Sequence, residues 1–178
     1  MSTSRQANLQ PRNLKSLLAW KALAVVIAFA FLALSVPFWL SILYRLPPDF
    51  FKILAGLLPF GALLVSAYFR ILRILHEGLH VIAALWLDIP GKDLRAKGVH
   101  VYIRRAPKRE WILVTLCPII LPVFALLILG PFDMNWAFVY FFAIMVGSSK
   151  DLASVLFVLL EPGQFVQNTS NGLSVTAA

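Results

Sequence analysis

Long, nearly uninterrupted apolar runs constrain the fold of this chain more than any other feature of its sequence. A membrane-spanning helix needs about 20 apolar residues, and four runs meet that length: residues 17–43, 51–87, 111–129 and 136–160. Charged residues make up 13% of the chain, about half of what a soluble domain carries. We therefore predict an all-α polytopic membrane protein with about four transmembrane helices and a short β element in the loop 91–110.

The second run is too long for one perpendicular crossing. A helix over residues 53–87 would be about 50 Å long, whereas the hydrocarbon core of a bilayer is about 30 Å thick. Pro59 and Gly61 could kink such a helix, or residues 72–88 could form a separate re-entrant piece. One kinked helix and two separate pieces both remain open.

The basic residues, which give a net charge of +8, flank the apolar runs. They gather near the N-terminus (residues 1–16) and in the loop 91–110, and the positive-inside rule places both segments in the cytosol. We expect a membrane domain over residues 17–160, followed by a loosely ordered cytosolic tail over 161–178, in the plasma membrane. Basic residues at this position favour the lipid bilayer as partner, and we expect no binding of nucleic acid.

The loop 91–110 contains a strand-like segment. Val99, Val101 and Ile103 alternate with polar or aromatic residues, and a period of two is typical of a β-strand; Pro107 ends the pattern. Two interpretations remain open: a short amphipathic hairpin on the membrane surface, or an edge strand that pairs with an extended substrate.

The chemistry of the chain centres on His76-Glu77-Gly78-Leu79-His80. Histidines four residues apart stack on one face of a helix and can bind one zinc ion, while the adjacent glutamate acts as general base. Ionisable residues within an apolar segment are costly and usually functional. The motif therefore predicts His76 and His80 as ligands of Zn²⁺ and Glu77 as the catalytic base.

A catalytic zinc ion normally has three protein ligands, so the third must come from elsewhere in the chain. Asp151 is the favoured candidate, because it lies within the fourth run at about the same depth as the two histidines, beside Gly147, Ser148 and Ser149, whose small side chains allow helices to approach closely. His100 is the main alternative. The other acidic candidates are Asp88, Asp133 and Glu161.

Arg70 lies about two turns and Arg73 about one turn before the motif. They could bind a substrate carboxylate or a developing oxyanion; the favoured interpretation is that they snorkel, or pair with Asp151 or lipid phosphate.

Pro118 and Pro122 interrupt the third run. Each removes a backbone N–H donor, so we expect a loosened helix with freed carbonyl groups.

The histidine motif on a membrane helix, with an aspartate on a later span, resembles the site-2 protease class of intramembrane zinc metalloproteases. The chain is more closely similar to the DUF3267 family of zincin peptidases. The shared features are the early His-Glu-x-x-His, the strand-like loop after it and Gly147-Ser148-Ser149-Lys150-Asp151. This resemblance implies His76, His80 and Asp151 as zinc ligands and Glu77 as general base.

We predict a zinc metalloendopeptidase that hydrolyses peptide bonds of membrane proteins or peptides in or beside the bilayer, with a zinc-bound water activated by Glu77. The alternative is a non-catalytic membrane protein that uses the His, Glu and Asp cluster as a structural metal site or a partner-binding site. Ion or proton transport through the cluster ranks last, because the outer halves of the predicted spans offer almost no polar path. The sequence leaves the substrate and the oligomeric state undetermined.

Overall fold

A computed structural model describes residues 15–47, 49–97, 100–169 and 172–176, apart from the side chains of residues 15–18, 51–68, 97, 100, 102, 169 and 172. The basic residues Arg5 and Arg12 of the predicted N-terminal segment lie outside the described residues. The helices are α1 (Lys15–Leu43), α2 (Phe50–Trp86), α3 (Lys108–Leu116), α4 (Ile120–Leu129), α5 (Met134–Gly147) and α6 (Ser149–Leu160), with 3₁₀ turns η1 (Gly91–Asp93) and η2 (Cys117–Ile119). The strands are β1 (Leu94–Lys97), β2 (His100–Ile103), β3 (Arg105–Pro107), β4 (Phe165–Thr169) and β5 (Gly172–Thr176).

The first predicted span is confirmed as the single helix α1, which packs against α5 and α6. Near one end of α1, the rings of Phe38 and Phe138 stack with centroids 4.6 Å apart. Near the other end, the indole N–H of Trp20 donates to Ser154 Oγ at 3.0 Å. The first contact holds α5 against α1, and the second holds α6 against α1 within one turn of Asp151.

The second apolar run forms one helix, α2, which settles the question of one piece or two. Its 37 residues give a length of about 55 Å, which exceeds the hydrocarbon core. All residues of the histidine motif therefore lie on one continuous helix.

Both later runs are broken within their length. The third consists of α3 and α4 separated by η2, whose first turn contains Pro118. The fourth bends by 57° between α5 and α6. The small residues before Asp151 were expected to let two helices approach closely, and for Gly147 this was wrong. A Cβ built on Gly147 would meet nothing within 4 Å, so no neighbouring helix packs closely against this glycine. Ser148 and Ser149 are buried at the break.

Among the described residues, two helical stretches are long and apolar enough to cross a membrane, Ala19–Leu43 and Lys108–Leu129. A third candidate exists if α5 and α6 count as one bent span. Four spans were predicted, and the fourth is not confirmed. It corresponds to α2, where the side chains of residues 51–68 lie outside the described part of the structure.

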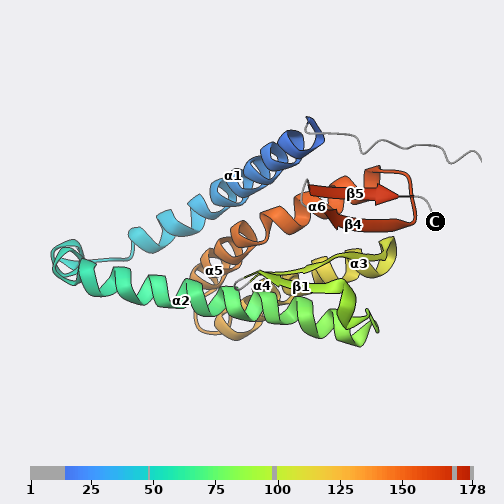
Figure 1. Ribbon diagram of the computed structural model, residues 1–178. Helices are drawn as coiled ribbons and strands as arrows, with labels where there is room; N and C mark the ends of the chain where they lie inside the picture. Colours follow the sequence, from blue (N-terminus) through green and yellow to red (C-terminus); the bar gives the residue numbers. More distant parts are fainter. Residues whose placement is uncertain (1–14, 48, 98–99, 170–171, 177–178) are drawn as a thin grey trace, which may run out of the picture.

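The fold contains more β-structure than the sequence predicted. The expected strand in the loop 91–110 is confirmed: β2 pairs antiparallel with β1, so that Val101 lies opposite Ala96. The tail was expected to be loosely ordered, and this was wrong. β4 and β5 form an antiparallel hairpin that joins β3 in a three-stranded sheet. The hairpin is stabilised because Val166 is buried in the hydrophobic core. Figure 1 shows the strands gathered where α2 ends and α1 begins.

A small core ties this end of the molecule together. Ala83 and Ala84 on α2 have almost no exposed surface, and their small side chains let α2 approach the neighbouring elements closely. Val166 of β4 is completely buried beside them. The other members come from the loop after α2, from α3, from α6 and from the strands: Ile89, Ile103, Ala106, Trp111, Val114, Val155 and Val158. This core begins three residues after His80 and holds α2, α3 and α6 in fixed relation around the histidine motif.

Candidate metal centre

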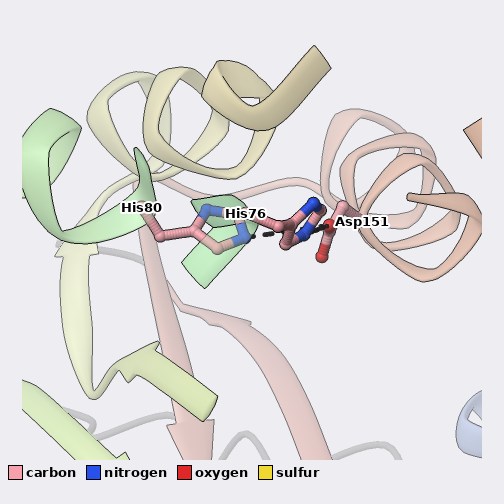
Figure 2. A group of neighbouring side chains, drawn as sticks. All are labelled: His76, His80 and Asp151. Atoms are coloured by element: carbon pink, nitrogen blue, oxygen red, sulfur yellow. Dashed lines mark hydrogen bonds and ion pairs between the residues drawn. The ribbon is translucent and has the colours of Figure 1, made fainter. Parts of the chain in front are cut away.

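Three potential metal ligands from two helices converge at one point. His76 and His80 point from α2 toward Asp151 at the start of α6, as Figure 2 shows. The Nε2–H of His76 donates to Asp151 Oδ2 at 2.8 Å, and His80 Nε2 lies 3.7 Å from the same oxygen. The side chains of His76, His80 and Asp151 are 17%, 11% and 25% exposed, so the cluster is mostly buried.

The donor set and its spacing suit zinc. The three ligand atoms all lie within 4.8 Å of one another. A tetrahedral zinc ion with ligands at about 2.1 Å would separate neighbouring ligand atoms by about 3.4 Å. The separations from Asp151 Oδ2 to the two histidines, 2.8 and 3.7 Å, bracket that value. Two imidazoles and one carboxylate are also a common donor set of catalytic zinc sites.

The ring of His80 is oriented by a backbone carbonyl. Its Nδ1–H donates to the carbonyl oxygen of Val114 on α3 at 2.9 Å. A carbonyl can only accept a hydrogen bond, so Nδ1 carries a proton and Nε2 is the ring nitrogen that faces Asp151 and could bind a metal. Metal-binding histidines usually have such a partner on their second nitrogen.

Pro118 explains why this carbonyl accepts a bond from His80. In a regular helix, Val114 O would receive the N–H of the residue four positions later, and proline has no N–H. The carbonyl instead accepts from the Cys117 N–H at the end of α3 and from His80. The sequence did predict freed carbonyls at Pro118, but it carried no signal that connected one of them to the histidine motif.

The carboxylate of Glu77 is held by the strand β2. The backbone N–H of Val101 donates to Glu77 Oε2 at 2.8 Å. Since Val101 directs its N–H toward α2, the edge of β2 that does not pair with β1 faces Glu77. Sequence reasoning identified both the strand and the glutamate and missed their contact, because every residue except proline has a backbone N–H.

The bend between α5 and α6 sets the position of Asp151. Ser148 lies at the break, and Asp151 is in the first turn of α6. A carboxylate is favourable there, because the N-terminus of a helix carries partial positive charge. The break thus turns Asp151 toward α2 and gives it an environment that accommodates its negative charge.

The remaining acidic candidates from the sequence are not part of this cluster. Asp133 caps the N-terminus of α5, where it accepts the N–H groups of Asn135 and Trp136 and pairs with Arg45 at 3.3 Å. Glu161 follows α6, ten residues from Asp151, which is about 15 Å along the helix axis. Asp88 follows the end of α2 on the exposed surface.

The alternative ligand His100 begins β2, but its side chain lies outside the described part of the structure. Its role as a ligand is therefore untested.

Two cavities adjoin the cluster. One, of about 260 Å³, reaches His80 and Asp151 from the side of the strands and is lined by Val101, Ile103 and Trp111 among others. The other, of about 540 Å³, lies between α2, α4, α5 and α6 and reaches His76, Glu77 and Asp151. Its lining also includes Arg70 and Arg73. The cluster is thus accessible from two sides.

Comparison with protein families gives one match. The family model DUF3267, with the description "Putative zincin peptidase", matches residues 69–166, which is more than half of the chain. The matched segment contains His76, Glu77, His80 and Asp151, together with both of the backbone groups that hold them. No curated protein and no solved structure matches the chain.

Proposed function

We propose that this chain, which belongs to the DUF3267 family, is a zinc metalloendopeptidase that hydrolyses peptide bonds of membrane protein substrates in or beside the bilayer. One observation carries the proposal: the ligand atoms of His76, His80 and Asp151 converge, and Glu77 is adjacent to His76 and lines the same cavity. The description of the family supports a zinc peptidase. The similarity to site-2 proteases remains a prediction.

In the proposed reaction, His76, His80 and Asp151 hold the zinc ion. When bound, zinc polarises the attacking water and the scissile carbonyl. Glu77 accepts the proton of this water and then transfers it to the nitrogen of the leaving amine. The hydrogen bond from Val101 occupies one carboxylate oxygen of Glu77. It helps to fix the position of the carboxylate.

The strand β2 is the proposed docking edge for substrate. The edge of β2 opposite to β1 faces Glu77, and an extended peptide can add to a strand edge through backbone hydrogen bonds. A transmembrane segment must unwind to bind in this way. Backbone pairing of this kind would place the scissile bond beside Glu77 with little dependence on side-chain identity.

The proposed location is the plasma membrane, with four spans, both termini in the cytosol and a membrane domain over residues 17–160. Two to three candidate spans support a membrane location. The start of α1, the end of α2 and the strands lie at one end of the molecule in Figure 1. That end also carries the basic loop 91–110, so the positive-inside rule favours the cytosol for it.

A substitution that preserves the metal cluster tests the proposal. Glu77→Gln keeps the shape of the side chain and removes the base. In proteoliposomes with a library of single-span membrane proteins, mass spectrometry should detect zinc-dependent cleavage products with the wild type and not with Glu77→Gln, while both proteins bind zinc.

Cleavage that is unchanged in Glu77→Gln would refute the role of Glu77. The absence of any cleavage by a zinc-loaded wild type would favour the alternative, a non-catalytic metal or partner-binding site.

A further inference from the structure

The cavity of about 540 Å³ beside the candidate metal centre has an excess of positive charge. Three cationic side chains line it: Arg70, Arg73 and Lys150. Among its described lining residues, the acidic side chains are Glu77 and Asp151, and the proposed function assigns both to catalysis and zinc binding. A bound zinc ion would increase the excess further.

The two arginines are placed on the catalytic face of α2. Residues at positions i, i+3 and i+7 share one face of a helix, and Arg70, Arg73 and Glu77 have this spacing. Arg73 lies about 6 Å and Arg70 about 10 Å from Glu77 along the helix axis. Both line the same cavity as Glu77, which argues against the earlier interpretation that they only snorkel to the membrane surface.

The rest of the wall is largely apolar and includes Leu72, Leu121 and Ile144. Low-dielectric walls focus the field of charges that line a cleft. The guanidinium group matches a carboxylate in shape and can bind it with two parallel hydrogen bonds. A negatively charged group of a substrate would therefore be bound strongly in this cavity.

We propose that Arg70 and Arg73 select substrates with a carboxylate close to the scissile bond. The proposal rests on the proposed peptidase function and adds a substrate class to it. An extended peptide advances about 3.4 Å per residue, so the axial distances from Glu77 place this carboxylate about two to three residues from the bond that is cleaved. An acidic side chain and a free C-terminus provide the same group.

The test separates these two sources with matched peptides. Three apolar ten-residue peptides are compared: one with a single glutamate and an amidated C-terminus, one without glutamate and with a free C-terminus, and one neutral and amidated. Affinities are measured by fluorescence anisotropy on zinc-loaded Glu77→Gln protein in phosphatidylcholine nanodiscs, which binds without turnover.

We expect one or both carboxylate peptides to bind about 10- to 100-fold more tightly than the neutral peptide, as for a hydrogen bond to a charged group. This preference should disappear when Arg70→Gln and Arg73→Gln are combined, and it should partly remain with lysine at both positions. Arg109→Gln, an exposed arginine of α3 outside this cavity, is the matched control and should keep the preference. Zinc content verifies that each variant is folded.

Cleavage by the active wild type distinguishes this inference from the function itself. Products should end within about three residues of the glutamate or of the free C-terminus. Equal binding of all three peptides would overturn the inference even if all are cleaved. The inference would also be overturned if the arginine variants lowered kcat equally for every peptide, because this would indicate an oxyanion role. A preference that appears only with anionic lipid would overturn it as well, because this would indicate a site for lipid headgroups. Tight, arginine-dependent binding without any cleavage would support the carboxylate site at Arg70 and Arg73 and would count against the peptidase function.

Discussion

Replacing Pro118 by alanine would return a hydrogen-bond donor to the helix at the carbonyl that orients His80. The new N–H can donate to Val114 O, four residues earlier, where it competes with His80 Nδ1–H, now 2.9 Å away. A free His80 ring can turn its Nε2 away from Asp151. The substitution therefore tests whether a proline on the third span supports a ligand on the second.

The magnitude follows from the kind of contact that is weakened. Loss of an outer hydrogen bond to a metal-binding histidine typically lowers metal affinity about 10- to 100-fold, or about 1.4 to 2.7 kcal/mol. Val114 O has two lone pairs and can keep part of the His80 bond, so we expect a value near tenfold. The stability of the metal-free protein should change little, because about 1 kcal/mol from the regained backbone bond offsets much of the roughly 1.6 kcal/mol lost with two buried methylene groups.

The assay is competition for zinc against a chelator of known affinity, with purified protein in detergent. Pro122→Ala is the matched control, because Pro122 is equally buried in the same broken stretch and has no contact with His80 among the described bonds. Wild-type zinc affinity in a folded Pro118→Ala protein would refute the reasoning, as would an equal loss in Pro122→Ala.

Further predictions concern the strand, a helix cap and a helix contact. Val101→Pro removes the N–H that holds Glu77; kcat should fall at least about tenfold with zinc content intact, whereas Val101→Ala keeps the N–H and should retain activity. Asp133→Ala removes the cap of α5 and should cost about 1 kcal/mol of unfolding free energy; Asp133→Ser should restore most of it, and a change in zinc affinity would contradict the assignment of Asp133 to the cap alone. Trp20→Phe removes the donor to Ser154 and should cost about 1 kcal/mol, measured by thermal unfolding; unchanged stability would show that this contact does not hold α1 to α6.

The parts of the fold that depend on hydrophobic pattern were predictable. The apolar run at residues 17–43 became α1, and the alternation around Val101 became β2. The tail was missed because Phe165–Thr169 and Gly172–Thr176 are short and partly polar. Their pairing with β3 depends on a surface formed by other elements. Such a long-range contact leaves no periodicity in a short segment.

The candidate site was predictable where it depends on side-chain chemistry. His76 and His80 are fixed by helical spacing, and Asp151 was selected by depth and by its resemblance to a family motif. The bend at Ser148 was not predicted, because small residues suit both a close helix approach and a helix break. The backbone groups of Val101 and Val114 were missed, since no side chain marks which amide or carbonyl meets a site.

The most direct test of the central claim is the metal content of purified protein in detergent, measured by elemental analysis. The proposed zinc centre predicts about one zinc ion per chain in the wild type and in Glu77→Gln, and its loss from folded His80→Ala and Asp151→Ala. A folded wild type that takes up no metal when zinc is supplied would contradict the claim. Zinc that remains in Asp151→Ala would show that another residue, with His100 the first candidate, completes the site.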